Sequence, residues 1–356
     1  MTIDHLTPAV IAFFLAIFFV LALHPMARET GLVDQPGGRK RHIGAIPMVG
    51  GVAMFAGLLF TLPMYSTFGV EARSFLLASA LLVTIGMLDD RFDLKPSVRL
   101  VGQTCAVMIA IFGAGAFIGS IGDPFGFGAI GLGPVAFAFT ILTMLTVINA
   151  FNMMDGVDGL CGVLAFVALL GCATIGGAHT WAPALMVLLA VIAGFLVFNL
   201  PLTINRGVRT FMGDAGSTFL GFAVVFMVVQ MSQGTGAVMS PVVGLFLAAL
   251  PLYDLFISML RRMANGRSPF SADRQHIHHV LQRAGFSGRI TLLILATLAM
   301  LYMLVGVIGT VAGASDALLF GLWLAFGVGH FLLMSRAPRF IRWVRTLTRR
   351  LATDSA

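Results

Sequence analysis

The length of the uninterrupted apolar stretches constrains this chain more than any other feature of its sequence. Hydrophobic residues make up 58% of the 356 residues, charged residues only 10%, and the mean hydropathy is +0.98. A soluble domain carries about 25% charged residues, so this chain cannot cover a water-facing surface. These values exclude a soluble enzyme, a collagen, a coiled coil and a disordered tail. We therefore expect the chain to fold in lipid.

A bilayer core about 30 Å thick requires roughly 20 apolar residues in each crossing helix. Along this sequence that length predicts an all-α polytopic membrane protein with about eleven transmembrane helices. The predicted spans are residues 7–27, 46–64, 73–88, 98–118, 132–150, 159–177, 181–199, 216–232, 238–260, 290–311 and 316–335. The first is expected to be a signal anchor, because it is long and further spans follow. One integral-membrane domain is predicted over residues 1–335, followed by a basic tail over residues 336–356.

The basic residues predict the orientation of these spans. Of the 22 lysines and arginines, all but Arg73 fall in segments that the predicted spans place on one side. Basic loops stay in the cytoplasm, so the N-terminus is predicted to be periplasmic and the C-terminus cytoplasmic. The net charge of +7 is then a topology signal, and no nucleic-acid partner is expected. The tail is expected to lie along anionic lipid at the inner leaflet.

Carboxylates are scarce in this composition, so their positions are informative. Most of the 15 aspartates and glutamates fall on the predicted cytoplasmic side, several of them at helix ends near the lipid boundary. An unpaired carboxylate is costly there and is a functional candidate by default. We therefore expect an active site on the cytoplasmic face, built from loops 28–45, 89–97, 151–158, 200–215 and 261–289.

Asp89 and Asp90 end the third predicted span. Adjacent carboxylates repel each other unless a cation or a proton separates them, and Mg²⁺ prefers oxygen ligands. The alternative is a solvated loop in which the aspartates pair with Arg91 and Lys95.

A polar stripe ends the fifth predicted span. Its members recur every three residues along one side of a helix, and they are Asn149, Asn152, Asp155 and Asp158. A polar seam between helices would explain the asparagines better than the aspartates, so a functional role is favoured.

Asp214 lies among small residues just before the eighth predicted span. Free amides at a helix start favour anions such as phosphate. Asp214 itself could cap this helix or bind a metal.

The loop over residues 261–289 holds three histidines within four positions, His276, His278 and His279. They could form a zinc site, but no cysteine or HExxH motif accompanies them. Donors to phosphate oxygens fit better beside Arg274, and a solvated face is the remaining alternative. A second basic loop, with Lys40 and His42 among turn-forming residues, lies on the same predicted side. Metal-binding acids and phosphate-binding bases together indicate phosphoryl chemistry at the lipid boundary.

Five ordered motifs carry a family resemblance. They read DxPxxRKxHxGxxPxxGG at 34–51, LDDRFDL at 88–94, NxFNxxDGxDGL at 149–160, FMGDAGS at 211–217 and SPFSADRQHIHH at 268–279. In this order they resemble the polyprenyl-phosphate N-acetylhexosamine-1-phosphate transferase family (glycosyltransferase family 4), and within it the WecA-type branch. The HIHH form separates this branch from the muramyl-pentapeptide transferases, which have consecutive histidines.

The resemblance implies transfer of GlcNAc-1-phosphate from UDP-GlcNAc to undecaprenyl phosphate in the bacterial cytoplasmic (inner) membrane. The products would be undecaprenyl-diphosphate-GlcNAc and UMP, the start of a cell-surface polysaccharide such as O-antigen. Another UDP-N-acetylhexosamine and a homodimer remain open. The implied cofactor is Mg²⁺, with Mn²⁺ as an alternative.

The resemblance also implies roles for single residues. Asp89 and Asp214 would be the metal neighbours. The implied catalytic residues are Asp89, Asp90, Asp155, Asp158, His278 and His279. The implied substrate-binding residues are Lys40, His42, Asn152, Asn199, Phe211, Arg274 and His276, with Asn199 and Phe211 near the uridine.

Two mechanisms and three rival functions follow. Direct attack by the lipid phosphate is favoured over a two-step route with Asp90 as nucleophile, because a phosphate monoester is largely dianionic at neutral pH. An ion-coupled transporter would use Asp254 within the ninth span. An aspartyl intramembrane protease would need glycine where Phe211 stands, and a lipid-binding scaffold has no need for five phosphate-type motifs.

Overall fold

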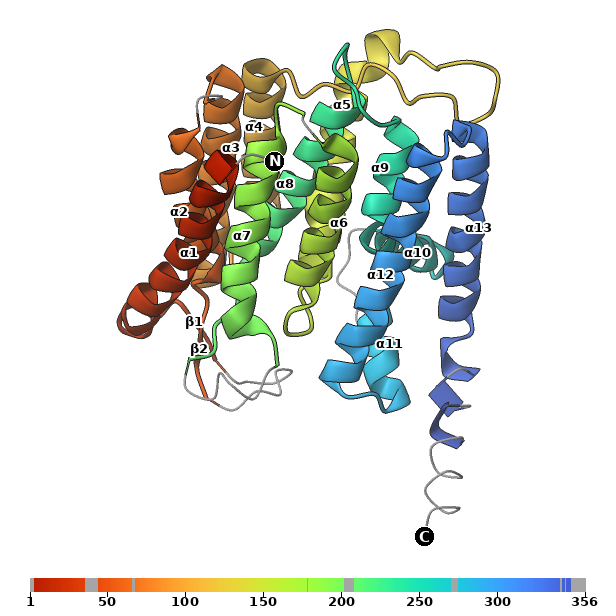
Figure 1. Cartoon of the computed structure of the whole chain (residues 1–356). Coiled ribbons are helices and arrows are strands. Elements are labelled where there is room, and N and C mark those ends of the chain that lie inside the picture. Colours follow the sequence, from red (N-terminus) through yellow and green to blue (C-terminus); the bar gives the residue numbers. More distant parts are fainter. Residues whose placement is uncertain are drawn as a thin grey trace.

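The computed structural model describes residues 3–35, 44–65, 68–177, 179–201, 208–269, 275–339, 341–342 and 344–346, with side chains from residue 6 onward. The described chain is mostly helical (Figure 1). Its helices and strands are α1 (Ile3–Thr30), β1 (Val33–Asp34), β2 (Ile46–Pro47), α2 (Gly50–Thr61), η1 (Leu62–Met64), α3 (Val70–Phe92), α4 (Pro96–Ala114), η2 (Gly133–Val135), α5 (Ala136–Met153), α6 (Leu160–Gly176), α7 (Ala182–Asn199), α8 (Gly213–Ser232), α9 (Pro241–Leu247), α10 (Ala249–Ala264), α11 (Ile277–Ala284), α12 (Gly288–Val311) and α13 (Asp316–Ser335).

The helical, polytopic class expected from the sequence is confirmed. Among the described residues, eight helices are long and apolar enough to cross a membrane. The predicted span 238–260 is a pair of helices, α9 and α10, bent by 81°. The predicted spans 46–64 and 159–177 correspond to shorter apolar helices, Gly50–Met64 and Leu160–Gly176. Every predicted span therefore contains a helix, while the number of complete crossings remains a prediction.

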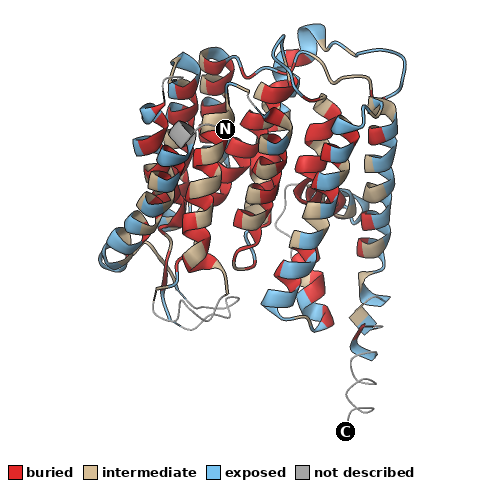
Figure 2. Cartoon of the chain, in the orientation of Figure 1, coloured by how far each residue is buried: buried red, intermediate tan, exposed pale blue. Residues whose placement is uncertain are grey.

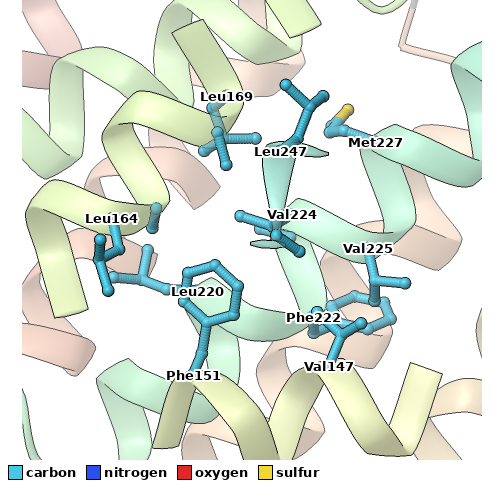
Figure 3. Packing of buried hydrophobic residues seen from close by; sticks show 14 of the residues in the cluster. Val147, Phe151, Leu164, Leu169, Leu220, Phe222, Val224, Val225, Met227 and Leu247 are labelled. Carbon is cyan, nitrogen blue, oxygen red and sulfur yellow. The ribbon is translucent and has the colours of Figure 1, made fainter. Parts of the chain in front are cut away.

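Helix α8 is the centre of the bundle. It contacts α2, α3, α5, α6 and α9, and nearly all of its residues are buried. Around it pack the side chains of α5, α6 and α9, among them Phe151, Leu164 and Leu247 (Figure 3). Because this helix is surrounded by protein, groups at its ends can be placed without contact with lipid.

Apolar residues also cover the outside of the molecule. Buried residues concentrate in the inner helices, whereas α1, α12 and α13 show long exposed faces (Figure 2). The exposed side chains there include Phe14, Phe18, Leu293 and Ile308. An outward apolar surface of this extent is stable against lipid tails, which are as apolar as leucine.

Small residues bring two helices close to the start of α8. A Cβ atom added to Gly51 of α2 or to Gly86 of α3 would collide with the backbone of Gly216 or Ala215. Backbones approach this closely only where side chains are absent. The C-terminal end of α3 is thereby held against the first turn of α8.

A short hairpin lies at the same end of the bundle. β1 and β2 pair antiparallel, with Val33 opposite Pro47. The Pro47 carbonyl accepts the N–H of Phe211, and the N–H of Gly50 donates to the Phe211 carbonyl. These bonds join two segments about 160 residues apart in sequence, so the first and fourth motifs meet in space.

Candidate active site

Asp89 is paired with an arginine that comes from the next helix. Arg99 Nη1 lies 2.8 Å from Asp89 Oδ2 and 3.3 Å from Asp214 Oδ2. The other Asp89 oxygen accepts the N–H of Leu94 at 2.8 Å, and the residue is buried. The two predicted metal neighbours therefore converge on one cationic nitrogen. The alternative of a solvated loop at Asp89 is wrong, because Arg91 donates instead to the Gly31 carbonyl.

Asp90 points to the start of α8. Its Oδ1 accepts the N–H of Asp214 at 2.8 Å and its Oδ2 that of Ala215 at 3.3 Å. Gly213 has φ +67° at this point, where an added Cβ would strike the Asp90 carboxylate. A carboxylate that accepts the free amides of a helix start stabilises the helix. The alternative that Asp214 caps its own helix is wrong, and the anion at this helix start is Asp90.

Asn152 joins the end of α5 to this cluster. Its Nδ2 donates to Asp214 Oδ1 at 2.7 Å and to Ser217 Oγ at 2.9 Å. One turn earlier, Asn149 donates to Gln103 Oε1 at 2.9 Å. The asparagines of the polar stripe therefore connect α5 to α8 and α4, and Asn152 also orients Asp214.

A small cavity of about 20 Å³ lies among these side chains. A space of this size holds about one water molecule or ion. Its lining residues are Leu82, Ile85, Gly86, Asp89, Arg99, Gln103, Asn149, Asn152, Asp214 and Thr218. The predicted metal neighbours thus border a space with room for one small occupant.

Asp155 and Asp158 lie in the turn between α5 and α6. Asp158 forms an ion pair with Arg209, whose guanidinium carbon lies 5.3 Å from the centre of the Phe211 ring. Asp155 keeps solvent-exposed surface, yet protein atoms crowd its carboxyl group. This desolvation, together with the negative charges of Asp214, Asp90 and Asp158, raises the pKa of Asp155 to about 8. The protonated form of the Asp155 carboxyl is therefore favoured.

Asn199 lies behind this turn and is buried. Its Oδ1 accepts the N–H of Gly159 at 2.7 Å and its Nδ2 donates to the Thr210 carbonyl at 2.8 Å. Gly159 has φ +79°, a conformation that favours glycine. Asn199 therefore ties the Asp155–Asp158 turn to the segment that carries Phe211. Its expected contact with uridine remains a prediction.

The three histidines lie at the start of α11. His276 Nδ1 is 2.6 Å from Asp254 Oδ2, and the ring centres of His278 and His279 are 4.2 Å apart. Burial, and then the neighbouring His279, lowers the pKa of His278 to about 3. Burial and the neighbouring His276 also lower the pKa of His279. His278 is therefore a neutral ring at physiological pH.

His278 also connects α11 with the aspartate turn. A Cβ added to Gly156 would strike His278 Nε2, so the ring packs directly on the backbone beside Asp155. The turn and the histidines thus form one surface. Lys40, His42 and Arg274 lie outside the described residues.

Two residues at this end of the bundle were not predicted as site residues. Arg99 was counted only among the topological charges, and Asp254 was assigned only to a rival transporter. The signal for Asp254 is a carboxylate inside an apolar span, which is expensive without a partner. Arg99 follows Asp89 by ten positions, and only the packing of α4 against α3 brings the two together.

The donor set at Asp89 and Asp214 suits a hard divalent cation. Mg²⁺ is commonly held by one or two carboxylates, with waters and substrate phosphates completing its shell. Two carboxylates already face a single cationic nitrogen here, so their oxygens can share a cation. Within the described part of the chain, no group of three or more His, Cys, Asp or Glu side chains is arranged to hold a metal. The alternative of a three-histidine zinc site therefore has no support.

Comparison with known proteins places the chain in a family. Residues 72–232 match the family model described as glycosyl transferase family 4. A protein of Yersinia pestis is 35% identical over 98% of this chain and 96% of its own length. A protein of Escherichia coli (strain K12) is 34% identical over 97% and 95%, and one of Pasteurella multocida (strain Pm70) is 36% identical over 96% and 96%. All three relatives are named undecaprenyl-phosphate alpha-N-acetylglucosaminyl 1-phosphate transferase.

The extent of these similarities decides the family. They cover nearly the whole chain and nearly the whole length of each relative. The chain therefore belongs to glycosyl transferase family 4, among the WecA-type polyprenyl-phosphate N-acetylhexosamine-1-phosphate transferases.

Proposed function

We propose that this protein transfers GlcNAc-1-phosphate from UDP-GlcNAc to undecaprenyl phosphate, giving undecaprenyl-diphosphate-GlcNAc and UMP. The observation that carries the proposal is the convergence of Asp89 and Asp214 on one cationic nitrogen, with Asn152 bonded to Asp214. These three residues come from three separate motifs. The names of the full-length relatives support the same substrates. The product is a lipid-linked sugar, the acceptor from which a cell-surface polysaccharide such as O-antigen starts.

In the proposed reaction, an oxygen of the lipid phosphate attacks the phosphorus that bears the sugar. The bond from this phosphorus to the bridging oxygen breaks, and its electron pair leaves with UMP. No strong base is required, because a phosphate monoester has a second pKa of about 6. The larger task is to bring two anions together, which charge neutralisation and positioning achieve.

The chain's own residues have distinct tasks in this scheme. Asp89 and Asp214 would hold Mg²⁺, or Mn²⁺ in its place, and the bound metal would neutralise phosphate charge. Asp155, protonated up to about pH 8, can donate a hydrogen bond to a phosphate oxygen. His278 can donate one as a neutral ring without bringing a charge.

The position of Asp90 supports the direct route. Both of its oxygens accept backbone N–H groups of α8, so attack on phosphorus would require the carboxylate to leave the helix start. The transporter alternative loses its main support in a similar way. Asp254 is bonded to His276 and to the N–H of Ile277, and these contacts account for its presence in a span.

We further propose that the chain crosses the bacterial inner membrane eleven times, with the site in the cytoplasm. The long helices, the bent pair and the two shorter apolar helices together match the eleven predicted spans. The β1–β2 hairpin and α11 lie toward the same end of the bundle (Figure 1), and the three histidines lie at the start of α11. The charge rule predicts that the basic loops lie in the cytoplasm.

The experiment is release of UMP by the purified protein in detergent, with undecaprenyl phosphate, Mg²⁺ and a panel of UDP-N-acetylhexosamines. We expect release that depends on lipid and metal and is greatest with UDP-GlcNAc. Asp89→Asn and Asp214→Asn should each lower kcat by at least about 10²-fold, because each removes charge stabilisation at the transferred group.

Asp316→Asn is the matched control for this experiment. Asp316 also accepts a backbone N–H, that of Asp123, but at the opposite end of the bundle. It should therefore retain full activity. No UMP from the folded wild-type protein across the whole panel would overturn the proposal.

A further inference from the structure

Asp254 is a buried carboxylate within α10, with 1% of its surface exposed. Its two oxygens bind separate groups of the histidine segment. Oδ2 lies 2.6 Å from His276 Nδ1, and Oδ1 accepts the backbone N–H of Ile277 at 2.8 Å. One carboxylate therefore contacts both the ring of His276 and the first residue of α11.

A whole face of α10 contributes to this contact. Asp254, Ser258 and Arg261 are separated by four and three residues, so they share one side of the helix. Ser258 Oγ lies 3.4 Å from His276 Nδ1. Arg261 Nη1 donates to the Gln275 carbonyl at 3.2 Å. The part of the bent pair beyond the 81° break thus supports residues 275–277.

The chemistry of this contact determines which histidine nitrogen carries a proton. An ionised carboxylate has acceptors only, so His276 Nδ1 must present a hydrogen to Asp254. Nε2 is then the ring nitrogen left for a ligand. The ring is 6% exposed, and its neighbours His278 and His279 lie 5.8 and 6.3 Å away between ring centres. His276 is thus oriented by its partner and not by solvent.

We propose that Asp254 is a positioning residue of the transferase. It holds His276 in the Nδ1-protonated form and fixes the start of α11, so that the unprotonated Nε2 is left to accept a hydrogen bond from an N–H or O–H group of the sugar nucleotide. The proposal rests on the proposed function, because it takes His276 as a substrate-binding residue. Asp254 itself has both oxygens engaged by the protein and acts through the ring.

Asp254→Asn separates the two tasks of this carboxylate. The amide oxygen can still accept the N–H of Ile277, so the start of α11 keeps its bond. The amide nitrogen is a donor, and it can meet His276 Nδ1 only if that nitrogen has lost its hydrogen. The substitution should therefore move the ring proton to Nε2 while the fold is kept.

The first measurement is nitrogen NMR of the full chain with ¹⁵N-labelled histidine, in detergent at neutral pH. The His276 signals are assigned by their loss in His276→Gln. We expect a protonated Nδ1 in the wild type and an unprotonated Nδ1 in Asp254→Asn. The same Nδ1 state in both proteins, or an unprotonated Nδ1 in the wild type, would overturn the proposal.

The second measurement is a double-mutant cycle on kcat/KM for UMP release. Asp254→Asn should lose about 10²-fold, the usual cost of a misplaced binding group. His276→Gln should lower kcat/KM by at least the same factor. Adding Asp254→Asn to His276→Gln should not lower kcat/KM further. Asp316→Asn again serves as the matched control with full activity. Losses that multiply in the double variant would show that Asp254 does not act through His276.

The two measurements separate failure of this inference from failure of the proposed function. Wild-type protein that releases no UMP would overturn the function, and the nitrogen signals would still decide the pairing. Active protein with an unchanged His276 signal in Asp254→Asn would overturn the inference alone. If Asp254→Asn does not fold, the His276 signals of the wild type still give the state of Nδ1.

Discussion

Asp89 and Asp90 are neighbours in the sequence, yet they have different surroundings. Asp89 pairs with Arg99 and faces the small cavity, whereas Asp90 accepts two backbone N–H groups at the start of α8. The family motif alone assigns Asp89 and Asp90 to the same set of catalytic residues. The side-chain contacts instead divide them into a candidate metal neighbour and a residue that holds a helix start in place.

Asp155 allows a prediction at this scale about pH and stability. Its pKa of about 8 in the folded protein lies far above the ordinary aspartate value of 3.8. At pH 6.5 to 8 the unfolded chain has already released this proton, while the folded protein releases it as the pH rises. The folded state binds more protons in this window, so the free energy of unfolding falls with increasing pH.

The measurement is the unfolding temperature of wild type and Asp155→Asn in detergent between pH 6.5 and 8. We expect the wild type to lose more stability than the variant across this window. His278 does not disturb the comparison, because its folded pKa of about 3 affects stability mainly below pH 6.5. Equal slopes in the two proteins would contradict the raised pKa.

Among the helices, α8 determines the geometry of the candidate site. Its first turn receives Asp90 from α3, Asn152 from α5 and the close approach of Gly51 from α2. Its remaining length is buried among apolar side chains of its neighbours (Figure 3). The start of α8 is thus anchored in the protein interior. The histidines at the start of α11 are held by contacts with α10, the second helix of the bent pair.

Gly86 provides a test of this packing. Gly86→Ala would push a Cβ atom into the backbone of Ala215, which cannot move without shifting the start of α8. Overpacking of this kind typically costs about 1–3 kcal/mol. We expect a lower unfolding temperature and reduced UMP release.

Gly321→Ala is the matched control in α13, where an added Cβ meets no atom within 4 Å. Alanine is favoured over glycine in a helix by about 0.5–1 kcal/mol, so this variant should be as stable as the wild type or more so. Equal unfolding temperatures of the Gly86 and Gly321 variants would refute the close α3–α8 contact.

The whole molecule has two different ends. One carries the hairpin, the aspartate clusters and α11, and the other carries the loop between α4 and α5. Large apolar faces on α1, α12 and α13 lie between these ends (Figure 2). The molecule thus combines a polar candidate site with a large surface suited to lipid, and the proposed reaction between a soluble nucleotide and a lipid needs both.

Cysteine labelling tests the orientation of the two ends. In a Cys105→Ala background, which removes the exposed cysteine, single cysteines are placed at Phe127 and Asn265. A membrane-impermeant thiol reagent should label Phe127→Cys from the periplasmic side and Asn265→Cys only after the inner membrane is opened. The reverse pattern would invert the proposed topology.

The sequence by itself determined the helical membrane class, the positions of the apolar helices and the five motifs. Each of these follows from local chemistry: lipid requires long apolar helices, and phosphate and metal require particular side chains. Only the tertiary structure decided that Arg99 joins Asp89 to Asp214, that Asp90 binds the start of α8, and that Asp254 holds His276. The two members of each pair come from different helices. The hydrophobic pattern predicts which residues are buried, but it does not predict which residue of a neighbouring helix each one contacts. The partner of a buried charge is set by how helices pack, which is a property of the whole bundle.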